Sequence, residues 1–592
     1  MGDESMEVAK IASSAEVVRI TSSMEQLQTK LRAELVRGVA LDVCLSRFGQ
    51  HFARPDPGMF KVDHHLYDLS KQMNRFHSFL SHDWNTSRCL KVMSLMVLYN
   101  SRAAFLSSLL VSLCVSILCG TQLIPDGFWP TLLAYSVFPF VLLFWQRIRS
   151  VILRSPKTVF FDKLCIAQHD EELKRAGIFG LAGFLDHSDE LTVLWSKRYF
   201  SRLWCTYEIS TFLRETEKPK PILVMPVKLA VVLMIFSAAM HLVMVGFSML
   251  NHFLCKSLGW ELHIGWIRVQ EDYFENLFHV PFFGVVMPLL YYIGIGMMED
   301  LAALPDQLRH FRVQDADCFC CSNQHRHPET GEVMPCDRLL IFKMLKRWYG
   351  RENDPKGEKL YLERFNFLVQ EELAPKVLRS MGSDMLPLNY SFYMLIPAIL
   401  PVLTSLIPKI MAGQSELPDA SQQVIWALRL LMNWSMDGIL ALFWMRSSMR
   451  IWLMAVRYMP QCCSKHRVLM AFLLTMPAAL MLTLILFSCD ICMYLSKDDS
   501  MLPAIPFTIW LVILCGVWSQ RSHVSQTGPI VGRSGSADLE SLESCNGYQM
   551  DHFEYDEQQL PRENSSGDLK PDFSECNESE GDCDVSNEYF YV

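Results

Sequence analysis

Eight apolar stretches, each close to the length of a membrane-spanning helix, constrain this chain of 592 residues more than any other feature. A helix needs about 20 consecutive apolar residues to cross the hydrocarbon core of a bilayer. The stretches are 103–124, 128–145, 229–250, 277–298, 390–411, 424–445, 468–495 and 502–518. Because 51% of the residues are hydrophobic and only 20% are charged, we expect a multi-pass integral membrane protein in contact with a lipid bilayer.

Basic residues between these stretches predict how the chain is oriented. The segment 446–467 holds Arg446, Arg450, Arg457, Lys465 and Arg467, whereas 412–423 and 496–502 hold one lysine between them. Lysine and arginine are enriched in cytosolic loops. With eight spans, this asymmetry places both termini in the cytosol.

The negative charge of the chain is concentrated in its C-terminal segment. Residues 519–592 contain 16 acidic and 4 basic residues, a net charge of −12, so the rest of the chain carries about +3 when the total is −9. This segment is rich in serine, glycine and asparagine, which predicts an acidic disordered tail. The charge of the remainder gives no reason to expect a nucleic-acid partner.

Short apolar runs outside the long stretches are typical of buried β-strands. They lie at 76–81, 159–161, 191–195 and 221–227. Helical patterns separate them, at 90–98, at 173–185 and after Ser201. This alternation favours a parallel sheet covered by helices. The preceding residues, 1–75, are predicted to be a helical lead-in, with a helix through Met24, Leu35 and Val36.

One stretch of this unit, LTVLWSKRYFSRLWCTYEISTFL at 191–213, combines a strand with a helix that carries Trp204 and Glu208. These two residues are spaced i and i+4, which places them on one helix face. The face follows the carboxyl end of a strand, where open α/β sheets bind ligands. The alternative interpretation is a solvated glutamate beside a tryptophan of the core.

Three segments in order, FLSHDW, VFFDK and LTVLWSKRYFSRLWCTYEI, resemble the Toll/interleukin-1 receptor (TIR) domain. The third resembles the plant TIR pattern S-x-x-Y-x-x-S-x-W-C-x-x-E-L. The matching residues are Ser196, Tyr199, Trp204, Cys205 and Glu208, whereas Arg202 stands in place of the second serine and Ile209 in place of the leucine. The resemblance covers residues 76–227 and implies a flavodoxin-like parallel sheet.

The resemblance implies two alternative activities, since some TIR domains signal by associating with other TIR domains and others hydrolyse NAD. For hydrolysis it implies that Glu208 is catalytic and acts on the ribose, and that Trp204, Ser81, Phe161 and Asp162 bind the substrate. The loop at 81–84, however, reads Ser-His-Asp-Trp and lacks the arginine that active members often carry there. We therefore expect signalling or scaffolding through self-association or contact with other TIR-like domains, with NAD hydrolysis as the alternative.

A pair of predicted spans interrupts this domain, which ordinary TIR domains lack, and the arrangement resembles multi-spanning TIR-like proteins of protists. The predicted fold is mixed: an α/β TIR-like domain interrupted by a transmembrane hairpin, plus a polytopic helical membrane domain. Its parts are a lead-in at 1–75, the TIR-like domain at 76–102 and 147–227, the hairpin at 103–146, spans at 228–298 and 389–518, a cytosolic insert at 299–388 and the tail at 519–592.

The insert contains a cluster of candidate metal ligands, Cys318, Cys321, His325, His327 and Cys336. Thiolates and imidazoles at such spacing can form a tetrahedral zinc site. The alternative is a reduced, cysteine-rich loop that binds no metal.

A channel or transporter with a TIR-like regulatory domain is a further alternative. Asp437 lies near the middle of the sixth predicted span, where a carboxylate costs about 2.5–3.5 kcal/mol and usually faces a partner or a water-filled path. Pro397, Pro401 and Pro408 also interrupt the fifth span.

Overall fold

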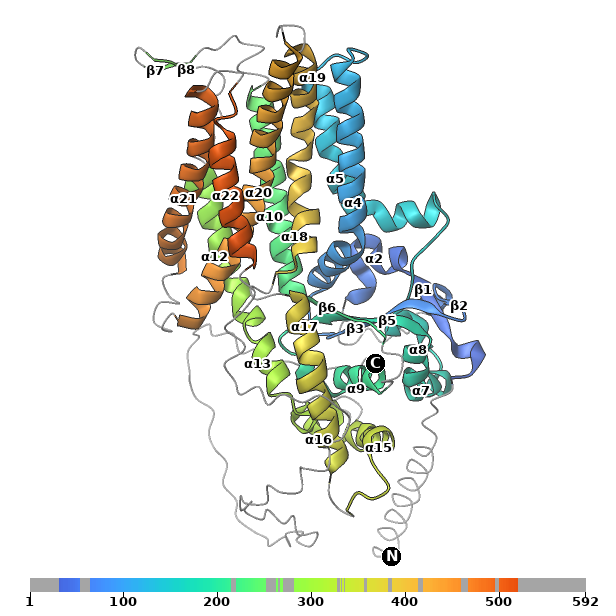
Figure 1. Cartoon of the computed structure of the whole chain (residues 1–592). Helices are drawn as coiled ribbons and strands as arrows, with labels where there is room; N and C mark the ends of the chain where they lie inside the picture. Colours follow the sequence, from blue (N-terminus) through green and yellow to red (C-terminus); the bar gives the residue numbers. More distant parts are fainter. Residues whose placement is uncertain are drawn as a thin grey trace, which may run out of the picture. The chain divides into compact units, whose positions relative to one another are not determined.

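A six-stranded sheet organises the soluble part of the chain (Figure 1). Its central strands are β3 (Phe76–His82), β4 (Thr158–Phe160), β5 (Ser188–Trp195) and β6 (Ile222–Pro226), which run parallel in the order β4-β3-β5-β6. Strands therefore lie at all four positions where the sequence indicates them. By chain order this is 2-1-3-4, the order with which flavodoxin-like sheets begin.

The computed structural model describes residues 31–53, 64–214, 220–251, 262–264, 267–269, 282–326, 331, 333–334, 336–355, 359–381, 386–413, 419–458, 467–495 and 500–519. The predicted tail lies outside these residues except for Ser519, and so does the predicted helix from Met24 to residue 30.

The sheet is mixed rather than entirely parallel, because the predicted lead-in contributes two strands. β1 (Arg37–Ala40) pairs antiparallel with β4, and β2 (Lys71–Gln72) pairs antiparallel with β1. The helix predicted through Leu35 and Val36 is wrong here, since Ala33–Leu35 forms a 3-10 turn and the chain then becomes extended. Gly38 permits this packing, because a Cβ atom there would lie 2.6 Å from the Phe76 ring.

Short helices complete this layer of the chain. They are α2 (Leu41–Gly49), α3 (His64–Asp68), α6 (Asp162–Cys165), α7 (Glu171–Phe179), α8 (Leu181–Asp186) and α9 (Leu203–Leu213). In Figure 1, α2 lies on the side of the sheet that faces the long apolar helices, and α7, α8 and α9 lie on the other side. The core between them is aromatic, with the rings of Phe79 and Phe160 stacked 4.5 Å apart.

The helix that follows β3 continues without a break into the first apolar stretch. α4 (Arg88–Gly120) has 33 residues and is therefore about 50 Å long. Near its start, Tyr99 Oη hydrogen-bonds Thr192 Oγ1 of β5 at 2.6 Å and Glu190 Oε1 at 2.9 Å, which ties the helix to the sheet. Further along, large apolar side chains such as Leu110 and Ile117 are exposed, as expected for a lipid-facing segment.

The second helix of the hairpin, α5 (Phe128–Val151), packs along α4 and returns to the sheet, where β4 begins seven residues later. Asn100 of α4 donates a hydrogen bond to Leu142 O at 2.8 Å and accepts one from Gln146 Nε2 at 2.8 Å. This buried polar pair fixes the two helices to each other.

Six described helices or helix pairs are long and apolar enough to cross a bilayer, as a multi-pass integral membrane protein requires. They cover Arg88–Gly120, Phe128–Val151, Val227–Gly246, Gly284–Arg309, Leu388–Ala412 and Ala420–Arg457. The helices that form the last four are α10 (Val227–Asn251), α12 (Met287–Leu301) with α13 (Leu304–Arg309), α18 (Leu388–Leu395) with α19 (Leu403–Gly413), and α20 (Ala420–Tyr458).

The seventh and eighth predicted spans fall on α21 (Arg467–Leu495) and α22 (Ala504–Ser519). Their described apolar parts are shorter, at Val468–Leu482 and Ala504–Ile513, so eight spans stay a prediction. Between α10 and α12, β7 (Leu262–Ile264) and β8 (Ile267–Val269) form a small antiparallel hairpin.

A second connection joins the sheet to the membrane helices. β6 ends at Pro226, and α10 begins at the next residue, Val227, so no loop separates them. Lys228, in the first turn of α10, forms an ion pair with Asp300 of α12, with 2.6 Å between Nζ and Oδ2.

The insert after α12 is helical and packs against α9. Its elements are α13, α14 (Phe319–Ser322), α15 (Asp337–Tyr349), α16 (Leu360–Phe367), a π-helical turn (Leu368–Leu373) and α17 (Ala374–Met381). The ring of Trp348 on α15 stacks on Tyr207 of α9 at 5.5 Å, and Tyr349 Oη donates a hydrogen bond to Ser210 O at 2.6 Å. The insert therefore covers the helix that carries Glu208.

Candidate functional site

Glu208 lies at the carboxyl end of the two central strands, β3 and β5. Ser81, near the end of β3, donates a hydrogen bond from Oγ to Glu208 Oε2. Tyr199 Oη lies 2.5 Å from the same Ser81 oxygen. Either hydroxyl of this second pair can be the donor. The three residues thus form a hydrogen-bonded chain at the point where the strand order reverses.

The environment of Glu208 favours its neutral form. The pKa of Glu208 is raised to about 8, mainly by burial and also by the nearby charge of Asp162, although the Ser81 hydrogen bond and Arg202 act to lower it. The side chain is therefore mostly protonated at neutral pH. In that state it can exchange hydrogen bonds but cannot stabilise a developing positive charge.

Phe161 and Asp162 follow β4, and the carboxyl group of Asp162 is close enough to Glu208 to affect its pKa. Trp84 Nε1 donates a hydrogen bond to Asp162 Oδ2 at 3.0 Å, and burial raises the pKa of Asp162 to about 6. Phe161 is fully buried and packs on the rings of Phe52 and His82, with centroids 4.6 Å and 5.6 Å away. Phe161 thus has the surroundings of a core residue, whereas Asp162 has those of a polar site residue.

An arginine reaches the loop at 81–84 from elsewhere in the chain. Arg202 Nη1 lies 3.3 Å from Oδ1 of the buried Asp83, whose Oδ2 also accepts a hydrogen bond from Ser196 at 3.4 Å. The sequence shows no arginine within the loop, and it does not indicate that Arg202 lies next to the loop. The two residues are 119 positions apart, and no local pattern links them.

Trp204 does not share its partners with Glu208. Its indole Nε1 donates a hydrogen bond to Asp337 Oδ2 at 3.2 Å, and its ring meets Tyr207 edge to face at 5.8 Å. Asp337 is the first residue of α15, so Trp204 contacts the insert, whereas Glu208 contacts the sheet. The two residues are spaced i and i+4 on one helix, but they contact different parts of the protein.

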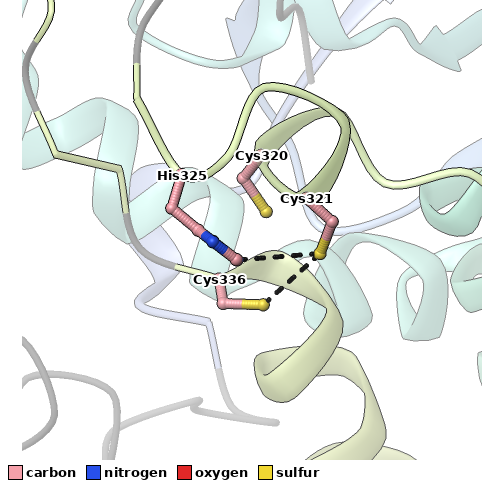
Figure 2. A group of neighbouring side chains, drawn as sticks. All are labelled: Cys320, Cys321, His325 and Cys336. Atoms are coloured by element: carbon pink, nitrogen blue, oxygen red, sulfur yellow. Dashed lines mark hydrogen bonds between the residues drawn. The ribbon is translucent and has the colours of Figure 1, made fainter. Parts of the chain in front are cut away.

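A second candidate site lies in the insert, next to Asp337. Cys320, Cys321, His325 and Cys336 converge so that their ligand atoms all lie within 4.8 Å of one another (Figure 2). Cys321 Sγ lies 3.7 Å from both Cys336 Sγ and His325 Nε2. Of the predicted ligands, Cys321, His325 and Cys336 are therefore brought together.

The remaining predicted ligands are placed differently. Cys318 Sγ lies 3.1 Å from Cys320 Sγ and belongs to a second group with Cys320 and Asp337. His327 lies outside the described residues. Cys320 was not among the predicted ligands, because the spacing Cys318-x-x-Cys321 favoured the outer pair of the three cysteines.

Asp437 lies in the middle of α20, within the span Ala420–Arg457, and is partly buried. Trp434, one turn earlier, donates a hydrogen bond from Nε1 to Ile399 O at 3.2 Å. Ile399 lies in the irregular segment between α18 and α19, where 3-10 turns at Ile396–Ala398 and Leu400–Val402 replace the α-helix.

Comparisons with family models, with curated proteins and with solved structures find no match to this chain.

Proposed function

We propose that this multi-pass membrane protein carries a cytosolic TIR-like domain and acts in signalling or scaffolding, through association of that domain with a second copy or with other TIR-like domains. The observation that carries the proposal is the continuity of α4, which leaves the sheet and enters the membrane as one helix of 33 residues. A rigid helix shared by both parts couples their orientations. The direct junction between β6 and α10 adds a second coupling point.

The strand order supports the TIR-like assignment of the domain. The parallel strands follow the order 2-1-3-4, as flavodoxin-like sheets do, and two residues that match the TIR pattern, Tyr199 and Glu208, meet Ser81 at their carboxyl ends. Four basic residues support a cytosolic position for this side of the membrane: Arg147 and Arg149 near the end of α5, and Arg154 and Lys157 between α5 and β4.

The surroundings of the two implied NAD-binding residues favour association over hydrolysis. Burial raises the pKa of Glu208 and so favours its neutral form, and Trp204 donates a hydrogen bond to Asp337 of the insert. Both side chains therefore make contacts within the protein, and these contacts stabilise the domain for association rather than prepare the side chains to act on a substrate.

Cross-linking of the full-length protein tests the association. Isotopically heavy and light chains are mixed in one membrane and treated with a lysine-specific cross-linker. We expect heavy–light cross-links between lysines of the sheet domain, such as Lys71, Lys174 and Lys197. The matched control, Val193→Asp, buries a charge in β5 and should remove them, because Val193 is fully buried. Heavy–light links confined to other regions would overturn the proposal.

NAD hydrolysis is the second candidate, favoured by the chain from Tyr199 through Ser81 to Glu208 at the switch point of the sheet. If the protein hydrolyses NAD, turnover should rise as Glu208 ionises near pH 8, because only the carboxylate stabilises the cationic transition state. Glu208→Gln should abolish this turnover, whereas Glu172→Gln, on the exposed side of α7, should leave it unchanged. Cleavage that survives Glu208→Gln excludes this role.

A channel or transporter is the third candidate, favoured by the broken helix between α18 and α19 and by Asp437 on the helix that contacts it. Ion flux into proteoliposomes should then fall for Asp437→Asn. Equal flux into wild-type proteoliposomes and into protein-free liposomes would exclude it.

A further inference from the structure

The cluster in the insert has the chemistry and the spacing of a structural metal centre. We propose that Cys320, Cys321, His325 and Cys336 bind one zinc ion, and that this ion fastens the insert to α9. Three thiolates and one imidazole form a closed tetrahedral donor set, which is typical of structural zinc.

Two of the distances between ligand atoms match those around a single ion. With Zn–S bonds of about 2.3 Å and a Zn–N bond of about 2.0 Å, neighbouring ligands of a tetrahedral site lie about 3.5–3.8 Å apart. The Cys321 sulfur lies 3.7 Å from the Cys336 sulfur and 3.7 Å from His325 Nε2. Figure 2 shows the side chains of all four residues directed toward a common centre.

The backbone turns sharply to deliver these ligands. Gln324 and His325 both have left-handed conformations, with φ of 54° and 58°, which non-glycine residues rarely adopt. His325 N donates to Cys320 O at 2.6 Å, and Met334 N donates to His325 O at 2.8 Å. The first bond folds the imidazole back over the cysteine pair, and the second brings the chain back toward Cys336. Strain of this kind persists where the surrounding structure holds it in place.

Cys320 has two further polar neighbours. The backbone N–H of Asp337 donates to Cys320 Sγ at 3.2 Å, and the Cys318 thiol lies 3.1 Å from the same sulfur. A backbone N–H that donates to a ligand sulfur helps to orient it. The proposed ligand set leaves out Cys318, because Cys318 groups with Cys320 and Asp337 and not with His325 and Cys336.

The contacts with α9 lie close to this cluster in the sequence on both sides, three residues before Cys320 and one residue after Cys336. Asp337, which follows Cys336, accepts the hydrogen bond from Trp204 Nε1. Asp317, which precedes Cys318, donates from its N–H to Ser201 O at 2.5 Å and accepts at its carbonyl from Leu203 N at 3.2 Å. An ion that fixes the cluster therefore fixes both contacts with the start of α9. This inference does not depend on how the TIR-like domain functions.

Metal analysis of the full-length protein, purified in detergent without chelators, tests the site. We expect about one zinc per chain, lost in Cys321→Ser and in His325→Ala. Cys89→Ser, an exposed cysteine on α4, is the matched control and should keep the zinc. Cys318→Ser should also keep it, whereas Cys320→Ser should lose it; the reverse result would overturn the ligand set. Absence of zinc in the wild-type protein, or iron in its place, would overturn the site.

Cobalt replacement and hydrogen exchange separate metal loss from misfolding. Cobalt(II) added to the zinc-depleted wild-type protein should give the absorption of a tetrahedral thiolate site, which zinc then abolishes. Removal of zinc by a chelator should accelerate exchange at 203–213 and 337–349 but leave β3 unchanged. Exchange that stays unchanged at 203–213 after zinc has left would overturn the fastening role, and absence of the cobalt spectrum would overturn the site.

Discussion

The indole nitrogen of Trp204 donates a hydrogen bond to a carboxylate oxygen of Asp337, 3.2 Å away and 133 positions later in the chain. This bond joins the helix that carries Glu208 to the first residue of α15. It also assigns Trp204 a structural partner in place of the substrate that the TIR resemblance implies. The insert and the sheet domain are consequently joined at Trp204, a residue of the TIR-like motif.

Trp204→Phe should loosen the insert without unfolding the sheet domain. The substitution keeps an aromatic ring but removes the donor to Asp337, and a typical hydrogen bond contributes about 0.5–1.5 kcal/mol. We therefore expect amide exchange in α15 to accelerate several-fold, measured by mass spectrometry on the intact protein. Trp129→Phe, at a tryptophan that is 75% exposed, is the control and should change nothing. Equal exchange in the two variants would show that the bond contributes no stability.

A second contact between α9 and the insert depends on Arg214. Its Nη2 lies 2.6 Å from both carboxylate oxygens of Asp186, and its guanidinium lies 5.0 Å from the centre of the Trp348 ring. Arg214→Lys keeps the charge but loses the planar group that stacks on the ring, so we expect the thermal midpoint to fall.

The matched control for this change is Arg75→Lys. Arg75 forms an exposed ion pair with Asp189, at 3.1 Å, and exposed pairs contribute about 0–1 kcal/mol. The midpoint should therefore fall clearly for Arg214→Lys and hardly at all for Arg75→Lys. A similar shift in both variants would contradict a specific role for the stacked guanidinium.

The raised pKa of Glu208 predicts that stability depends on pH. Its pKa is about 8 in the folded protein against an ordinary value of 4.5, so between these values the folded state binds more protons than the unfolded state. Stability should then fall as pH rises through this window. Asp162, with a pKa raised to about 6, contributes with the same sign at lower pH.

Glu208→Gln isolates the contribution of Glu208, because the amide stays neutral at every pH. We expect the variant to lose much of the decline in thermal midpoint between about pH 6 and pH 8, and Glu172→Gln, on the exposed surface of α7, to keep it. If the variant and the wild-type protein decline in parallel, Glu208 is already ionised at neutral pH.

The sequence predicted those strands that form continuous apolar runs. The strands at Phe76, Thr158, Ser188 and Ile222 are apolar runs of strand formers next to polar residues, and the structure has strands at each of them. β1 was missed because it has only four residues, Arg37–Ala40, too few for a periodicity. Its conformation follows from pairing with β4, which is distant in sequence.

The candidate sites also contain features that the sequence predicted and features that it did not. The motif led to Glu208, and Ser81 contacts it because adjacent strands carry both toward one edge of the sheet. The partner of Trp204 could not be predicted, since nothing in the sequence near Trp204 indicates where the insert docks. For the metal cluster, the sequence shows three cysteines within four positions but not which of them are ligands. The left-handed turn at Gln324 and His325, which brings His325 to Cys321, is visible only in the structure.

The continuity of α4 predicts the effect of a proline at Arg102, which is exposed and lies where the helix passes from the sheet to the apolar segment. Proline removes one backbone hydrogen bond and clashes with the preceding turn, which costs about 3 kcal/mol and kinks the helix. Spin labels introduced as unnatural amino acids at positions 89 and 114 should give one narrow distance of about 38 Å in the straight helix. Arg102→Pro should shorten and broaden this distance, and Arg102→Ala should preserve it. A distribution in Arg102→Pro as narrow as in Arg102→Ala would mean that the surrounding helices, and not the continuity of α4, align the domain with the membrane.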